Sequence, residues 1–176
     1  MAVTEGQRRI DRILDPAFVE GLDALPLDEL RARRDECMAE REYLSLLRRL
    51  VQGRLEILRA DHEARHADGE GTPVVDRLPE ILGSDEVGEG RGEAVRVGVP
   101  EDELLLARRR MERLVADAGV SDPSSLDDAV LEGSVETFAE EERIVSGSRR
   151  EVIEVLDRVI DELKRRYRDD PTLALT

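Results

Sequence analysis

The 176-residue chain has the length of one domain or of an extended element of similar size. Aromatic residues make up 2% of it and charged residues 39%, a composition that disfavours a β-protein and suits long helices that bury a single seam. The net charge of −15 at pH 7 repels nucleic acid and anionic membranes, which argues against direct DNA binding and favours a basic protein partner.

The N-terminal tail, residues 1–26, is expected to begin with a frayed charged stretch. Asp15 and Pro16 suit the N-cap and the first position of a short helix that runs through Leu22. The first thirty residues contain no apolar leader segment, and no run of the chain reaches transmembrane length. We therefore expect a cytoplasmic protein without membrane contact.

The first long helix is predicted over residues 27–66, because apolar residues recur there every seven positions. The repeating positions are Leu30, Cys37, Leu44, Val51 and Leu58. The seam is widened by Tyr43, Leu47, Leu50, Leu55 and Ile57. Cys37 is the only cysteine, which excludes an internal disulfide and a cysteine-based zinc site, and its heptad position favours a small core residue.

Residues 67–98 are predicted to be a flexible, acidic, glycine-rich linker. The run Gly88-Glu-Gly-Arg-Gly within it does not suit a phosphate-binding loop, because no strand precedes it and no Lys-Ser/Thr follows. Short helices are expected in the next segment, residues 99–133, one ending near Gly119 and one over residues 126–132.

The second long helix is predicted over residues 134–168, followed by a C-terminal tail over 169–176. Its heptad residues are Phe138, Val145, Val152 and Val159, supported by Ile144, Val155, Leu156, Ile160 and Leu163. Enough chain separates the two long helices for them to run in opposite directions. The sequence therefore predicts an all-α fold, an antiparallel coiled-coil helical hairpin with additional short helices.

Each long helix also carries a stripe of polar residues at helical spacing. The first stripe consists of Ser45, Arg48, Gln52 and Glu56. The second consists of Glu142, Ser146, Arg149 and Asp157. In both stripes Arg follows Ser by three positions and an acid follows Arg by eight, so the two helices together suggest a two-sided site.

The residue types in these stripes suit a guanine-containing dianion. Arg can donate two hydrogen bonds to guanine O6 and N7 or to a phosphate, and a carboxylate can accept from the N1 and N2 edge of guanine. Residues 41–61 hold five Arg against three acids and residues 142–157 hold three Arg against four, whereas the rest of the chain carries −16. The stripes are thus relieved of the general negative field.

A solvated helix face is the simpler interpretation of the same residues. Arg and Glu at these spacings decorate many exposed helices as i,i+4 pairs. Gly53 and Gly147, which are costly inside helices, fit either a closely approaching ligand or tolerated sequence variation. The stripes alone leave both interpretations open.

The two stripes resemble the signature of the RsiG family of actinobacterial anti-sigma factors, Glu-x3-Ser-x2-Arg-x3-Gln-x3-Asp, which occurs once on each helix of an antiparallel coiled coil. The first copy here has Arg41 at the position of Glu, with Glu42 adjacent, and Glu56 at the position of Asp. The second copy has Ile153 at the position of Gln. The segment Asp76-Arg-Leu-Pro-Glu-Ile-Leu is similar to the family as well.

The resemblance implies a non-enzymatic regulator that binds cyclic di-GMP and sequesters the sporulation sigma factor WhiG away from RNA polymerase. Two nucleotide molecules would lie between the coiled coil and the sigma factor, with guanines bound by Arg and acid and phosphates by Ser and Arg. The implied ligand-binding residues are Ser45, Arg48, Gln52, Glu56, Glu142, Ser146, Arg149 and Asp157. Further positions are Arg41, Glu42 and Ile153.

Two other classes of protein compete with this interpretation. A coiled-coil adaptor could bind a basic partner without any nucleotide, which would leave Arg48 and Arg149 as ordinary surface residues. An enzyme or metalloprotein could use His62 and His66, which lie one helical turn apart, but no third metal ligand is evident and a solvated turn is favoured. We expect no catalytic residues and no bound metal.

Overall fold

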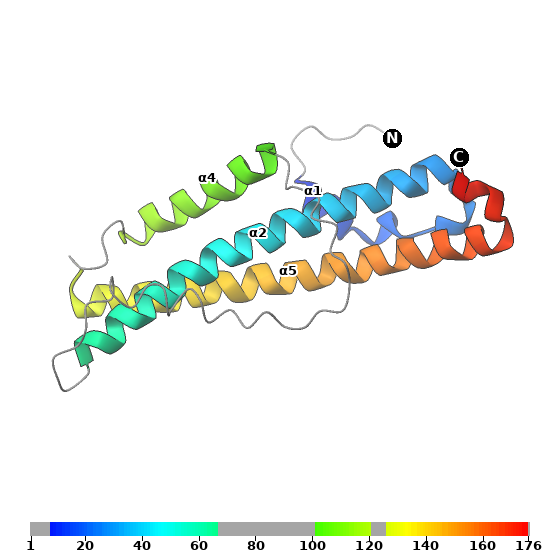
Figure 1. Ribbon diagram of the computed structural model, residues 1–176. Helices are drawn as coiled ribbons and strands as arrows, with labels where there is room; N and C mark the ends of the chain where they lie inside the picture. Colours follow the sequence, from blue (N-terminus) through cyan, green and yellow to red (C-terminus); the bar gives the residue numbers. More distant parts are fainter. Residues whose placement is uncertain (1–7, 67–100, 121–125, 176) are drawn as a thin grey trace. The chain divides into compact units, whose positions relative to one another are not determined.

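The computed structural model describes residues 8–66, 101–120 and 126–175 (Figure 1). The elements in these ranges are all helices, in the order α1 (Arg9–Ile13), η1 (Pro16–Phe18), η2 (Leu22–Ala24), α2 (Leu27–His66), α4 (Glu101–Asp117), α5 (Asp128–Asp169) and η4 (Pro171–Leu175). The predicted all-α fold class is confirmed. The linker predicted over 67–98 lies outside the described residues. None of the helices described is long and apolar enough to cross a bilayer.

The chain divides into two compact units, and both long helices pass from one to the other. Unit 1 comprises Met1–Ser45 and Ser146–Thr176, and unit 2 comprises Leu46–Val145. Within each unit a segment of α2 packs against a segment of α5, as the contacts below show.

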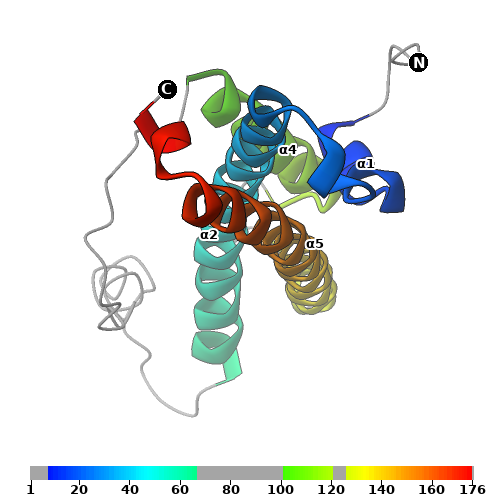
Figure 2. The ribbon, with the colours of Figure 1, turned by 90° about the vertical axis from the view of Figure 1, so that its right-hand side faces the viewer.

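In unit 1 the two segments run in opposite directions. Arg31, early in α2, donates from Nε to the hydroxyl of Tyr167, late in α5, at 3.1 Å. Ser45, much later in α2, accepts a hydrogen bond from Arg149, much earlier in α5, at 2.8 Å. Figure 2 views this end of the molecule, with the beginning of α2 in blue beside the end of α5 in orange and red.

Unit 2 repeats the antiparallel arrangement with its own residues. Arg48 pairs with Glu142 at 3.0 Å, and Arg65 pairs with Asp128 at 3.0 Å, so higher numbers on α2 again meet lower numbers on α5. Helix α4 joins this unit through Arg110, which donates to Glu141 of α5 at 2.7 Å. The predicted antiparallel pairing of two long helices is therefore confirmed in each unit.

The predicted heptad positions form the core of both helices, each with an exposed fraction of 2% or less. Apolar residues at a and d positions of facing helices bury one another, so the seven-residue period alone located this seam. Ile144 is an exception among the supporting residues, since 48% of it is exposed. It directly precedes Val145, and a step of about 100° around the helix turns it away from the core that Val145 enters.

Two predictions about the N-terminal end of the chain are wrong. Residues 8–14 are not frayed, because α1 buries Ile13 completely. Asp15 does cap the next element, accepting from the amide of Ala17 at 2.9 Å, but that element is a short 3-10 helix that ends at Phe18. Gly21 then adopts a left-handed conformation with φ of 60° and starts η2, so no single helix runs through Leu22.

The order of residues 8–14 has a physical cause in ion pairs that sequence spacing did not reveal. Arg9 and Arg12 of α1 bond the carboxylates of Glu40 and Glu36 on α2. These contacts join residues that are 31 and 24 positions apart. At the other end of the chain the predicted tail forms η4, whose Leu173 carbonyl accepts from Arg31 at 2.6 Å.

Helix α5 begins at Asp128, not at 134, and continues through the predicted break at Gly133. The side chain of Asp127 accepts from the amide of Val130 at 2.8 Å and caps the first turn. Leu131 is fully buried, and burial of a leucine stabilises by about 1.5–3 kcal/mol, more than the roughly 1 kcal/mol that glycine costs in a helix. Packing therefore fuses the predicted short helix with the long one.

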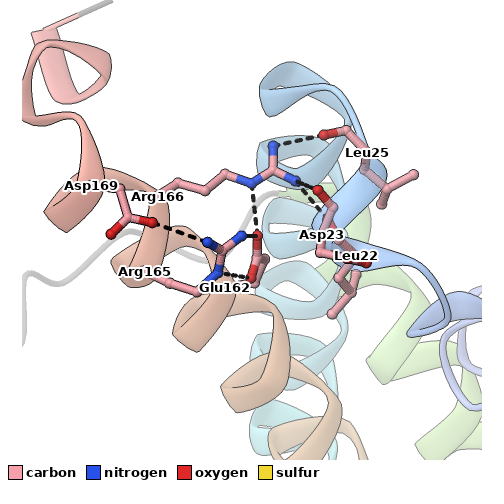
Figure 3. A network of polar contacts seen from close by, with 7 residues as sticks. All are labelled: Leu22, Asp23, Leu25, Glu162, Arg165, Arg166 and Asp169. Atoms are coloured by element: carbon pink, nitrogen blue, oxygen red, sulfur yellow. Dashed lines mark hydrogen bonds and ion pairs between the residues drawn. The ribbon is translucent and has the colours of Figure 1, made fainter.

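A network of arginines ties the end of α5 to the segment before α2 within unit 1 (Figure 3). Arg166 donates to the carbonyls of Leu22 and Leu25, each at 2.7 Å. Glu162 accepts from Arg165 at 2.7 Å and from Arg166 at 2.8 Å. Hydrogen bonds from these two guanidinium groups, first of all from Arg165, lower the pKa of Glu162 to about 2.

Replacing Glu162 with glutamine is expected to lower the free energy of unfolding at pH 7 by about 1–3 kcal/mol, the range for hydrogen bonds to a charged group. Because the pKa of Glu162 is lower in the folded state, its contribution is present above the ordinary pKa of 4.5 and is lost as the pH falls toward 2. Denaturant unfolding of both proteins at pH 7, 4 and 2 measures the difference. Asp161→Asn is the control, since Asp161 is 74% exposed in its pair with Lys164. Equal losses in both variants would contradict the prediction.

Cys37 is fully buried, and burial raises the pKa of its thiol to about 12. Since the thiolate is the reactive form, we expect Ellman's reagent to modify the native protein at least about 100-fold more slowly than the chain unfolded in guanidinium. The rate of colour release at pH 8 measures this. Similar rates in the two states would show that the helix opens readily around the thiol.

Candidate functional site

Arg48 of the first motif copy meets Glu142 of the second copy in unit 2. Its Nε donates to Oε1 of Glu142 at 3.0 Å. The two side chains are 40% and 23% exposed. The antiparallel arrangement thus places the arginine of one copy beside the acid that opens the other, in a position that solvent and a solute can reach.

This ion pair borders a surface hollow of about 310 Å³. The hollow is lined by Arg48, Gln52, Leu55, Glu56, Arg59, Ala139 and Glu142. Four of these residues belong to the predicted stripes. Leu55 is 5% exposed and contributes an apolar surface among polar neighbours. Such a mixture of a few placed polar groups and an apolar wall is typical of small-molecule sites.

Arg59 is a lining residue that the sequence motif did not indicate. It lies three positions after Glu56, so it continues the same helical stripe by one further step. The helical spacing could therefore have indicated Arg59 as a lining residue. It was not predicted because the motif ends at residue 56.

Unit 1 holds the other predicted residues in a different arrangement. Arg149 donates from Nε to the hydroxyl of Ser45 at 2.8 Å, and that hydroxyl donates to the carbonyl of Arg41 at 2.7 Å. Arg41 pairs with its neighbour Glu42 at 2.6 Å. Ser45 therefore links the side chain of Arg149, in the second motif copy, to the backbone of Arg41, in the first copy.

The remaining predicted residues of unit 1 lie on α5. Ser146 and Ile153 are half-buried, and Asp157 is exposed. Asp157 forms no hydrogen bond or ion pair with any residue in the described ranges. Among the predicted residues, the structure thus brings together Arg48 and Glu142 in unit 2 and Ser45 and Arg149 in unit 1.

The two helical glycines beside the stripes have open surroundings. A methyl group built at Gly53 or Gly147 would meet no other atom within 4 Å. Neither glycine is required by packing among the described residues, so alanine would fit at both positions.

His62 and His66 stack on one another, with ring centroids 4.3 Å apart. His66 Nδ1 lies 2.7 Å from the carbonyl oxygen of His62, which engages the ring within its own helix. No group of three or more His, Cys, Asp or Glu residues suitable for a metal ion occurs in the described part of the chain.

The described fold is all-α, and each unit contains antiparallel segments of two long helices. In each unit these segments bring together polar residues of the two motif copies. Residues 16–82 match the family model described as RsiG-like, which confirms the resemblance over that segment. The match covers the whole first motif copy. No curated protein matches the chain.

Proposed function

We propose that this protein is an anti-sigma factor that binds cyclic di-GMP and sequesters a sporulation sigma factor of the WhiG type. The observation that carries the proposal is the hollow of unit 2, where both motif copies supply lining residues. The RsiG-like match over residues 16–82, which include the α2 side of the hollow, supports the same assignment. In this proposal the protein is cytoplasmic, has no enzymatic activity, and needs neither a metal nor contact with DNA or a membrane.

The hollow in unit 2 has the chemistry to bind guanine. Arg48 can donate to O6 and N7 of the base or to a phosphate, and Glu56 can accept from N1 and N2. Leu55 and Ala139 offer the ring an apolar surface, and Gln52 can complete either a base edge or a phosphate contact.

Glu142 pairs with Arg48 at 3.0 Å. A partly exposed ion pair of this kind is worth about 0.2–1 kcal/mol, so a ligand that offers the guanidinium better acceptors can displace the carboxylate at little cost. Glu142 would then accept from a guanine edge. The pair keeps the guanidinium oriented at the hollow beforehand, which lowers the entropy lost on binding.

Unit 1 contributes a second set of contacts in this proposal. The guanidinium of Arg149, which donates to the Ser45 hydroxyl, has further N–H groups that suit a phosphate oxygen. The Ser45 hydroxyl would join this contact by exchanging its bond to the Arg41 carbonyl for one to the phosphate. Ser146 and Asp157 complete the set on α5, as the motif implies.

The acidic character of the chain suits a sigma factor as partner. A net charge of −15 attracts the basic surface that a sigma factor uses to bind DNA, and it accelerates the encounter of the two proteins. The nucleotide can control sequestration only by binding the complex more tightly than the free components. We expect cyclic di-GMP to contact charged side chains where the two proteins meet and so to favour the complex.

Calorimetric titration with cyclic di-GMP, with and without a WhiG-type sigma factor, tests the proposal. We expect binding of cyclic di-GMP but not of cyclic di-AMP, tighter when the sigma factor is present, and nucleotide-dependent loss of transcription by the sigma factor with RNA polymerase. Binding of the sigma factor without any response to the nucleotide would favour a plain coiled-coil adaptor. Failure to bind either molecule would refute both.

A further inference from the structure

The two motif copies are one pattern displaced by 101 residues, since 142 − 41 = 101 and the same shift relates every other position. Comparing the copies with each other shows where they differ. Three pairs of positions hold the same residue or a similar acid, namely Ser45 with Ser146, Arg48 with Arg149 and Glu56 with Asp157. The same shift relates two unlike pairs of motif positions, Arg41 with Glu142 and Gln52 with Ile153. It also relates Arg59 of the hollow to Ile160.

The tertiary structure sorts these differences into one unit. One member of each unlike pair lines the hollow of unit 2: Glu142, the acidic member of the first pair, and Gln52 and Arg59, the polar members of the other two. Their counterparts Arg41, Ile153 and Ile160 all belong to unit 1. One unit therefore has the complete polar set, and the other has two isoleucines and an arginine in its place.

In unit 2 the second motif copy supplies a carboxylate, Glu142, which pairs with Arg48 at 3.0 Å. Arg41, at the position equivalent to Glu142, is itself a cation and pairs with Glu42. Ile153 cannot accept or donate a hydrogen bond, and a polar base edge placed against it would remain unsatisfied, which costs affinity.

Arg59 strengthens unit 2 further. It is exposed, lines the hollow, and forms no hydrogen bond or ion pair with a described residue. With Arg48 it balances Glu56 and Glu142, so the hollow is formally neutral in a chain of net charge −15. A second guanidinium at this rim can bind a phosphate oxygen without first giving up another described partner.

We propose that the hollow of unit 2 is the principal cyclic di-GMP site, that Arg59 binds a phosphate of the ligand there, and that the counterpart residues in unit 1 bind the nucleotide more weakly. This inference rests on the proposed function. It adds a binding residue and an order of affinities for the two halves of the motif.

Arg59→Ala tests the added residue, with Arg49→Ala as its matched control. Arg49 lies exposed on the same helix outside the hollow lining and forms no hydrogen bond or ion pair with a described residue. Its substitution by alanine removes the same charge as Arg59→Ala. Loss of one charge-assisted hydrogen bond is expected to weaken cyclic di-GMP binding about tenfold in Arg59→Ala, against less than about twofold in the control. Equal effects of the two substitutions would overturn the role of Arg59.

The order of affinities is tested by Arg48→Ala against Arg149→Ala, each titrated with cyclic di-GMP in the presence of the sigma factor. Arg48→Ala is expected to weaken the tighter binding step at least about tenfold more than Arg149→Ala does. The double variant Arg41→Glu, Ile153→Gln, which gives unit 1 two of the three differing residues of unit 2, is expected to tighten the weaker step or to add a second one.

The outcomes separate this inference from the proposed function. Absence of any cyclic di-GMP binding by the unaltered chain, with and without the sigma factor, would overturn both. Binding that Arg48→Ala and Arg149→Ala weaken equally, or that the double variant leaves unchanged, would overturn the unequal halves alone. Circular dichroism of each variant verifies that the helices are retained.

Discussion

Reversing the charge of Arg48 to glutamate is expected to lower the affinity for cyclic di-GMP at least about 100-fold, because a bidentate arginine–guanine contact is worth about 1–3 kcal/mol and the new carboxylate repels the dianion. The substitution also places two carboxylates together, since the partner of Arg48 is Glu142 at 3.0 Å. Calorimetric titration of the variant, with the sigma factor present, measures the loss.

The charge-exchanged double variant, Arg48→Glu with Glu142→Arg, separates binding from folding. It restores an ion pair between the same two positions, so the stability lost in the single variant should return. The guanidinium would then enter the hollow from α5 and the carboxylate from α2, so the two charges exchange the positions at which the ligand needs them, and nucleotide binding should stay low. Full nucleotide affinity in the single variant would show that Arg48 is an ordinary residue of a solvated helix face.

Replacing Phe138 with alanine is expected to lower the free energy of unfolding by about 3–5 kcal/mol, the range for removing a buried aromatic ring. Phe138 is fully buried and is one of two phenylalanines in a chain without tryptophan, so few other side chains can fill the cavity. Denaturant unfolding followed by the helical circular dichroism signal measures the change.

Ile144→Ala on the same helix is the control for Phe138. Ile144 is 48% exposed, and its truncation should cost less than about 1 kcal/mol because little of the lost surface was buried. A similar cost for both substitutions would mean that the side of α5 carrying Ile144 is covered in solution, and a small cost for both would mean that the core around Phe138 repacks.

The helices themselves could be predicted from sequence because their signals are local. The apolar residue at every seventh position from Leu30 to Leu58 is visible without any knowledge of the partner helix, and the same holds from Phe138 to Val159. The Asp15 cap was likewise predictable, since the carboxylate and the amide it accepts from are two residues apart.

Predictions failed where distant residues outweigh local preference. The predicted helices over 126–132 and 134–168 left a break at residue 133, yet the packing that buries Leu131 carries α5 through it. Residues 8–14 were expected to fray, yet Arg9 and Arg12 bond carboxylates on α2. In both cases the helix is stabilised by contacts with other parts of the chain, and intrinsic helix propensity does not account for such contacts.

The sequence by itself determined the residue types and spacing of the two motif copies, because both are properties of a single helix face. Only the tertiary structure decided that Arg48 meets Glu142, that Arg149 meets Ser45, and that Arg59 lines the hollow with Gln52. These pairings depend on the register of two antiparallel helices. That register is set by core side chains that are far apart in the sequence, such as Leu30 with Val159 and Leu163, and neither motif copy contains that information alone.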